Sequence, residues 1–496
     1  MVIPVGTKAR PGDDPPALRG IPATRVQSVD DRHARFMAEL RRGRQAMRVS
    51  RVSVKQLFHT FDHSVPLKLD GRITIIHGLN GLGKTTLLRM VKSLCDSRYF
   101  ELLPIPFAEL RLDFDDESSI VVTKTADEET DHPKKRHRLR IGYLKNDVEI
   151  EHYKPTSHLD PNSLAIPLAE WVDQHIPGLN RIASNKWVHH PTGETFSLEE
   201  IVERFSDYMP PGINLIQRSA PGWIEQLNKA VRVRLIETQR LVTPRRLKRR
   251  ADYETASAIA PAITMHSEEL ASRIGKQEKD YGALAQTLDR TFPIRYVQQK
   301  QKISLSEEAL RARFQEIEAK RARLEEAGLL GKEETGFEMP QHMDDADRGV
   351  LSVYVHDIER KLSVFDDLAA RIDLFREIVN GHFLYKEMLI HKDKGFRFRS
   401  TRTGGELNAS DLSSGEQHEV VVLYELLFHV QENSLVMIGE PEISLHIAWQ
   451  EEFLRDLQRI IKLSPFDAVI ATHSPQIVND RWDLAVELTG PEENER

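Results

Sequence analysis

Cysteine is almost absent from this chain of 496 residues, because Cys95 is the only one. A single thiol excludes a disulfide within the chain and a zinc site built from several cysteines. No apolar run approaches the roughly 18 residues that a membrane span needs, and the N-terminus lacks the apolar core of a secretory signal. We therefore expect a cytoplasmic protein with no membrane partner.

Positive charge is not in excess either. Lys and Arg total 69, Asp and Glu total 76, and the net charge is −7. This balance excludes a positive field over the whole surface for binding nucleic acid, although local basic clusters can still bind phosphates. Apolar residues make up 40% and charged residues 29% of the chain, which are ordinary values for a globular protein. The chain can therefore form a large core.

Strand-like and helix-like patterns alternate near both ends of the chain. Residues 73–77 precede a glycine-rich turn and a helical pattern, and the apolar runs 435–438 and 468–472 lie on either side of another helical pattern. Buried strands that alternate with helices are typical of an α/β domain with a mostly parallel sheet. We expect the segments of about 48–125 and about 385–490 to contribute the two halves of this sheet.

Residues 265–385 are mostly helical in pattern and contain two runs of regularly spaced apolar residues. This spacing gathers the apolar side chains in one seam, which favours a short helical hairpin or coiled-coil arm, with an ordinary helical subdomain as the alternative. The runs are Ile303, Leu310, Ile317 and Leu324, and Ile358, Leu362, Phe365, Ala369 and Ile372.

The strongest motif is residues 78–85, Gly-Leu-Asn-Gly-Leu-Gly-Lys-Thr, which fits the phosphate-loop pattern G-x-x-x-x-G-K-[ST] in full. Glycines let the backbone direct N–H groups at phosphate oxygens, and the following helix adds its positive dipole end. Lys84 is expected to reach the β- and γ-phosphates of ATP, and the Thr85 hydroxyl to ligate Mg²⁺. Phe58 or Phe61 can stack on adenine, with core packing as the alternative for at least one of them.

Three further motifs follow in order along the chain. Residues 412–417 read Leu-Ser-Ser-Gly-Glu-Gln, residues 437–446 read Met-Ile-Gly-Glu-Pro-Glu-Ile-Ser-Leu-His, and His473 follows an apolar run. Together with the phosphate loop, they resemble the signature motif, Walker B and D-loop segment, and switch histidine of ABC-type ATPases. The spelling is similar to that of the branch with the SMC, RecF and OLD (overcoming lysogenization defect) proteins (AAA_21-like). The likeness covers about 48–125 and about 230–490.

The resemblance implies specific roles at an ATP site. Glu440 falls on the catalytic glutamate, which orients the attacking water, and His473 on the histidine that contacts the γ-phosphate. Ser413 and Gly415 would contact ATP held by the opposite subunit of a dimer. The resemblance assigns catalysis to Glu440, His473 and Lys84, and nucleotide binding to Gly78, Asn80, Gly81, Gly83, Lys84, Thr85, Thr86, Ser413, Ser414, Gly415 and Glu416.

Gly439 departs from the family pattern, in which an aspartate supports Mg²⁺. Because glycine has no side-chain oxygen, the expected protein ligands of Mg²⁺ are Thr85 and Gln239, which ends a predicted strand where such proteins keep their Q-loop. A surface glutamine is the alternative for Gln239. We therefore expect slow ATP hydrolysis, and the alternative is a catalytically silent, ATP-bound scaffold that holds a toxic partner inactive.

The composition and the resemblance together predict how the chain is divided into domains and connecting segments. The proline-rich N-terminal segment has little apolar periodicity and is expected to be disordered. The expected parts are a leader (1–46), the N-terminal half of an ATPase head (47–125), a mixed insertion (126–230), a returning strand and Q-loop (231–250), a helical insertion (251–385), the C-terminal half of the head (386–490) and a tail (491–496).

The long stretch between Lys84 and Ser413 excludes the compact nucleotide-binding subunit of a transporter. It is similar to the insertions of SMC, RecF and OLD proteins, which act on nucleic acid or hold a nuclease. The segment after His473 is too short for a nuclease domain. The chain thus resembles the standalone ATPase subunits of bacterial anti-phage systems, either the Septu type with an HNH nuclease or the PARIS type with a TOPRIM nuclease. We expect a homodimer or higher even oligomer with a separate effector.

Two basic clusters offer contacts to nucleic acid, each able to neutralise several phosphates. A solvated face or a contact with an acidic partner is the alternative. The clusters are Arg245, Arg246, Lys248, Arg249 and Arg250, the expected DNA contacts, and Lys134, Lys135, Arg136, Arg138 and Arg140.

Overall fold

The computed structural model describes residues 47–126, 137–155, 169–173, 176, 179–189, 195–198, 201, 221–237, 242–244, 259–299, 305–331, 339–340, 342–443 and 445–490. The predicted leader, Gln239 and the arginine-rich cluster at 245–250 lie outside the described residues, as do Lys134, Lys135 and Arg136. Within the described ranges, no helix is both long and apolar enough to cross a membrane.

The largest described sheet is antiparallel, which corrects the expectation of a mostly parallel sheet. The order is β2 (Phe61–Pro66), β1 (Val49–Leu57), β4 (Glu109–Phe114), β5 (Ser118–Ala126), β6 (His137–Lys145) and β7 (Val148–Tyr153). Short turns join β1 to β2, β4 to β5 and β6 to β7. The last of these turns lies at Asn146 and Asp147, whose positive φ angles of 51° and 59° suit a tight hairpin. Successive strands therefore reverse direction.

A second sheet has five strands, all parallel, and brings distant segments of the chain together as expected. Every residue of β17 and β18 is buried, which is usual for parallel strands that are covered on both faces. The order is β11 (Val233–Glu237), β17 (Leu435–Gly439), β18 (Asp467–Ala471), β3 (Ile73–His77) and β19 (Ala485–Glu487).

The parallel sheet separates two hydrophobic cores. Alternate residues of β17 face opposite sides, so that Leu435 and Met437 join one core while Val436 and Ile438 join the other. The first core contains helix α2 (Lys84–Cys95) and the antiparallel sheet. The second contains α10 (Ser414–Tyr424), α11 (Ile447–Leu463) and the long helices of the middle of the chain.

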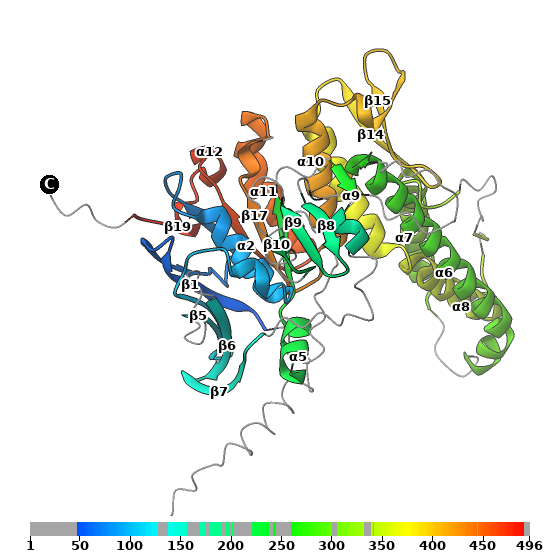
Figure 1. Ribbon diagram of the computed structural model, residues 1–496. Coiled ribbons are helices and arrows are strands. Elements are labelled where there is room, and N and C mark those ends of the chain that lie inside the picture. Colours follow the sequence, from blue (N-terminus) through cyan, green and yellow to red (C-terminus); the bar gives the residue numbers. More distant parts are fainter. Residues whose placement is uncertain are drawn as a thin grey trace, which may run out of the picture.

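Those helices form one side of the molecule, opposite the antiparallel sheet (Figure 1). The apolar seam that the spacing predicts is buried: Leu310, Ile317 and Leu324 are at most 3% exposed, while Ile303 lies outside the described residues. Because α8 packs against both α6 and α7, the seam belongs to a three-helix arrangement. The helices are α6 (Ala262–Gln299), α7 (Glu307–Glu326), α8 (Asp345–Ser363) and α9 (Asp366–His382).

Smaller elements complete the described fold. A hairpin follows α9, and a single π-helical turn continues α10. These elements are α5 (Gly222–Ala230), α12 (Pro475–Val478), the π turn η4 (Glu425–His429), and the strands β8 (Leu179–Ala183), β9 (Lys186–His189), β10 (Thr195–Phe196), β12 (Val242–Pro244), β13 (Ile259–Pro261), β14 (Lys386–His391), β15 (Gly395–Ser400) and β16 (Glu406–Leu407).

Candidate functional site

The phosphate-loop segment forms a tight turn between β3 and α2. Gly78 and Gly83 have φ angles of 149° and 83°, and an added Cβ would lie 2.7 Å from the Leu488 carbonyl oxygen and 2.6 Å from a Leu57 methyl carbon, respectively. The turn therefore needs glycine at both positions. No side chain caps the start of α2, and its first turn has no acidic residue. The free N–H groups of this helix end suit an anion.

Lys84 lies across the loop and is only 4% exposed. Its ammonium nitrogen donates to the carbonyl oxygens of Gly78 and Leu79, at 2.7 and 2.9 Å, and lies 3.2 Å from Nδ1 of His473. Burial lowers the pKa of the Lys84 ammonium, and the carboxylates of Glu440 and Glu442 oppose this shift. The loop thus carries a desolvated cation beside the predicted switch histidine.

Glu440 faces the same loop from the end of β17. Its Oε1 accepts a hydrogen bond from the Thr85 hydroxyl at 3.0 Å, and its backbone N–H donates to the Ala471 carbonyl at 2.7 Å. The φ angle of Glu440 is 51°, an unfavourable value for a non-glycine residue that is often found at active sites. Lys84, Thr85, Glu440 and His473 therefore converge at the carboxyl ends of three parallel strands, where α/β sheets bind ligands.

Gly439 is buried at the end of β17, between Glu237 of β11 and Ala471 of β18. A Cβ added here would have nothing within 4 Å, so this position does not require glycine for lack of space at Cβ. The neighbouring Glu237 is held by Arg89, whose Nε lies 2.7 Å from its Oε1. Thr85 remains the predicted Mg²⁺ ligand within the described residues.

The signature-like segment starts α10 with a capping box. Ser413 Oγ accepts from the Glu416 backbone N–H at 3.4 Å, and Glu416 Oε2 accepts from the Ser413 N–H at 2.8 Å. Lys386 donates to both carboxylate oxygens of Glu416, at 2.8 and 2.6 Å. Burial acts to raise the pKa of Glu416, but the hydrogen bonds from Lys386 and Ser413 outweigh it and the pKa is lowered.

The structure does not bring this segment to the phosphate loop of the same chain. Figure 1 shows α10 well apart from α2, with α11 and β17 between them in that view. Ser413 and Ser414 are exposed and Gly415 is half-buried, while Asn80 and Gly81 are exposed at the loop. Thr86 lies half-buried in the first turn of α2. The two exposed segments are free to meet a second molecule.

Two residues to which the sequence motifs gave no role interact with the backbone of the site. His63, which is 4% exposed, has its Nε2 at 2.8 Å from the Leu82 carbonyl oxygen, and Phe61 stacks on its ring with centroids 5.6 Å apart. The other, Glu442, accepts from the His473 backbone N–H at 2.6 Å. Phe58 is 38% exposed, and its ring edge lies 3.3 Å from the Cβ position of Gly83. Of the two aromatics, Phe58 is thus better placed to contact a base.

Comparisons with known proteins identify part of this region. Residues 289–479 match a family model described as "AAA domain, putative AbiEii toxin, Type IV TA system". Among the curated proteins that were compared, none matches the chain.

Solved structures that are similar to the chain include two SMC head domains. One is the Smc head domain of Pyrococcus furiosus with an extended coiled coil, bound to the C-terminal domain of ScpA, at 13% identity, covering 87% of this chain and 91% of that one, with a TM-score of 0.30. The other is the SMC head domain of Thermotoga maritima, at 11% identity, covering 88% of this chain and 92% of that one, with a TM-score of 0.29.

The family match and the phosphate loop support the same chemistry from different parts of the chain. The matched range includes Ser413, Glu440 and His473 and excludes the phosphate loop at 78–85. Together they support a P-loop ATPase, a class that uses a nucleotide and Mg²⁺.

Proposed function

We propose that the protein is an ABC-type ATPase, similar to SMC, RecF and OLD proteins, that binds ATP with Mg²⁺ and hydrolyses it slowly. One observation carries this proposal: the Thr85 hydroxyl lies 3.0 Å from Glu440 Oε1 and the Lys84 ammonium lies 3.2 Å from His473 Nδ1. Segments distant in the sequence thus place a phosphate-binding lysine, a hydroxyl, a carboxylate and a histidine at one sheet edge.

The roles follow from the chemistry of each group. Lys84 and the uncapped start of α2 bind the β- and γ-phosphates. Thr85 holds Mg²⁺, which supplies charge neutralisation for the phosphates when it is bound. Glu440 accepts a hydrogen bond from the attacking water and orients it, and His473 contacts the γ-phosphate through the ring nitrogen that now faces Lys84.

Gly439 supports slow turnover, and it also motivates the second candidate function. A glycine gives Mg²⁺ no carboxylate behind Thr85, so ATP can be bound and scarcely hydrolysed. In that case the ATP-bound protein would be a scaffold that keeps a toxic partner inactive. Glu440 is present and contacts Thr85, which favours hydrolysis.

Dimerisation would complete the site. Ser413 and Gly415 of one chain would contact the γ-phosphate bound by Lys84 of the other, using the N-terminus of α10. The exposure of Ser413 and Ser414 supports this arrangement. α10 packs against α6 and α9, so closing and opening of the dimer would bias the positions of the long helices.

We further propose that this motion gates a separate effector, an HNH or TOPRIM nuclease, or DNA, in anti-phage defence or DNA maintenance. This part rests on the resemblance of the motifs and on the long helical segment between them. Arg245, Arg246, Lys248, Arg249 and Arg250 are the candidate DNA contacts.

Steady-state ATP turnover with Mg²⁺ tests the proposal, measured with and without duplex DNA beside Glu440→Gln and Lys84→Ala. We expect low turnover that Glu440→Gln abolishes while ATP still binds, and loss of ATP binding in Lys84→Ala. DNA stimulation would identify nucleic acid as a direct ligand. Turnover in the wild type equal to that of Glu440→Gln, with ATP bound, would support the scaffold instead. Failure of the wild type to bind ATP would contradict both functions.

A further inference from the structure

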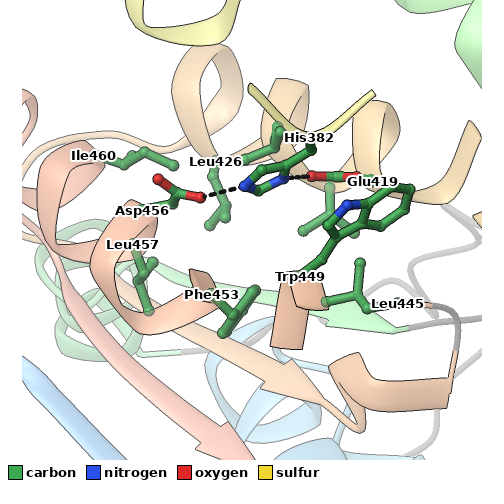
Figure 2. Close-up of a pocket in the computed structure, with 11 residues that line it drawn as sticks. His382, Glu419, Leu426, Leu445, Trp449, Phe453, Asp456, Leu457 and Ile460 are labelled. Carbon is green, nitrogen blue, oxygen red and sulfur yellow. Dashed lines mark hydrogen bonds and ion pairs between the residues drawn. The ribbon is translucent and has the colours of Figure 1, made fainter. Parts of the chain in front are cut away.

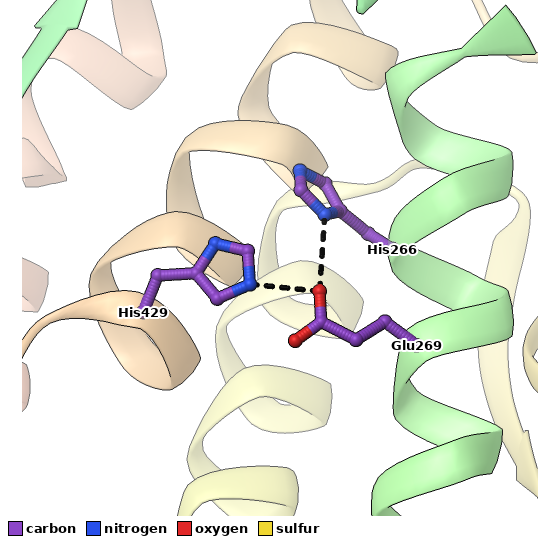
Figure 3. A group of neighbouring side chains, drawn as sticks. All are labelled: His266, Glu269 and His429. Atoms are coloured by element: carbon purple, nitrogen blue, oxygen red, sulfur yellow. Dashed lines mark hydrogen bonds and ion pairs between the residues drawn. The ribbon is translucent and has the colours of Figure 1, made fainter. Parts of the chain in front are cut away.

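Two histidines and a glutamate gather where α6 meets the π turn after α10. They are His266 and Glu269 on α6 and His429 on η4, and one ligand atom from each lies within 4.8 Å of the others (Figure 3). Glu269 Oε2 is 2.7 Å from His429 Nε2 and 4.0 Å from His266 Nδ1. In a tetrahedral Zn²⁺ site with bonds of about 2.0–2.2 Å, neighbouring ligand atoms are about 3.3 Å apart. Small side-chain shifts would therefore complete three ligand positions.

The second ring nitrogen of each histidine and the second carboxylate oxygen of Glu269 also have interaction partners. Metal-bound histidines usually donate their second ring N–H to a carboxylate, and metal-bound carboxylates are themselves hydrogen-bonded. Here Glu425 lies 3.5 Å from His266 Nε2 and 3.3 Å from His429 Nδ1, the two nitrogens that face away from Glu269. Arg273 donates to Glu269 Oε1 at 2.9 and 2.7 Å, which leaves Oε2 for a metal ion.

The surrounding groups fix this arrangement. Arg234 of β11 pairs with Glu425 and so holds that carboxylate in place. Its guanidinium, which lies 3.2 Å from His429 Nδ1, would turn to Glu425 alone when Nδ1 carries the proton. Tyr424 stacks on the His266 ring with centroids 4.5 Å apart. His266 is only 8% exposed, so packing holds its ring in place. Glu425 and His429 also lie in a π turn, a costly feature that is common at functional sites.

We propose that His266, Glu269 and His429 bind one Zn²⁺ ion, with Glu425 and Arg273 as positioning residues and a water as the fourth ligand. The side chains of Glu269 and His429 are 35% and 20% exposed, so an ion can enter. Bound there, Zn²⁺ would link the N-terminal part of α6 to η4. Because η4 continues α10, the ion would connect α6 to the helix that begins with the signature-like motif.

A second group with metal-ligand residues differs in these respects. His382, Glu452 and Asp456 also lie close together, but this group has a single histidine and its Glu452 is exposed. The two ring nitrogens of His382 face Glu419 and Asp456 (Figure 2). Burial acts to lower the pKa of His382, but the hydrogen bonds with these carboxylates raise it to about 10. With one nitrogen ligand and an exposed carboxylate, this group is the weaker candidate for a metal ion and serves as the control.

Zinc titration of the nucleotide-free full chain tests the proposal, followed by calorimetry and by the melting temperature. We expect one Zn²⁺ per chain, loss of binding in His266→Ala and in His429→Ala, and a 10–100-fold weaker affinity in Glu425→Gln. Glu452→Gln, in the other group, should bind Zn²⁺ as the wild type does. Absence of stoichiometric binding, or binding that depends on Glu452 and not on His266 and His429, would overturn the proposal.

The wild-type protein alone gives a second readout that needs no variant to fold. Co²⁺ in place of Zn²⁺ should show the intense visible absorption bands of a four-coordinate site, and an equivalent of Zn²⁺ should remove them. Only the weak bands of six-coordinate Co²⁺ would contradict the proposed ligands.

Discussion

Gly439 is the residue at which the chain departs most clearly from the motif it resembles, and the structure leaves space for a Cβ at this position. We predict that Gly439→Asp lowers the Mg²⁺ concentration for half-maximal turnover about tenfold, equivalent to about 1.4 kcal/mol, and raises turnover severalfold. The reason is that its carboxylate would support the ion beside Thr85. Turnover measured across a Mg²⁺ series gives the answer.

Gly439→Asn is the matched control, because it fills the same space without a charge and should leave the Mg²⁺ dependence unchanged. An unchanged Mg²⁺ dependence in Gly439→Asp would mean that another group already supports the ion.

Residues within one motif could be predicted from the sequence, whereas their supports from other segments could not. Lys84 and Thr85 belong to one loop whose spacing has a physical cause. His63 and Lys386 carry no such spacing, because each finds its partner, Leu82 or Glu416, only after folding. The His266, Glu269 and His429 cluster was missed for the same reason, since α6 and η4 are far apart in the sequence.

The start of α10 combines a structural and a proposed functional role, and the two can be separated. Ser413→Ala should cost about 1 kcal/mol of unfolding free energy through the lost N-cap, and it should also lower ATP turnover because Ser413 contacts ATP in the proposed dimer. Ser306 caps α7 in the same way, with its side chain accepting from the Ala309 N–H at 3.2 Å. Ser306→Ala should therefore cost a similar free energy with normal turnover. Equal turnover in both variants would remove Ser413 from the ATP site.

Side chains from three helices meet at His382 of α9, Glu419 of α10 and Asp456 of α11 (Figure 2). The pKa of His382 is raised from 6.5 to about 10, so its stabilising contribution is complete below about pH 6.5 and disappears as the pH rises through about 10. We predict that the difference in unfolding free energy between the wild type and His382→Gln shrinks from pH 7 to 10, by at most about 1.4 kcal/mol per pH unit.

Denaturant titrations at several pH values measure this difference. His356, exposed on α8, provides the control, and His356→Gln should show no such trend. A constant difference for His382→Gln over this range would contradict a protonated His382.

At the scale of the whole molecule, the sequence predicted the parallel sheet but not the antiparallel one. The apolar runs in β17 and β18 indicated a covered parallel sheet, because strands that are buried on both faces need apolar residues on both. β4 instead alternates half-buried polar and buried apolar residues, a pattern typical of an antiparallel sheet with one covered face. This alternation was the available signal for the large antiparallel sheet, which was not foreseen. The separation of α10 from the phosphate loop depends on how both cores pack around the parallel sheet, which no single segment specifies.

In the proposed dimer each ATPase site draws its residues from two chains, and mixing two inactive variants tests this arrangement. Lys84→Ala removes the phosphate contact of one chain, and Ser413→Arg blocks the signature-like contact of the other. Each variant alone should show no turnover, whereas their mixture should regain part of the wild-type rate, because mixed dimers hold one intact site. A mixture that stays at the background rate, under conditions where the wild type hydrolyses ATP, would contradict the two-chain site.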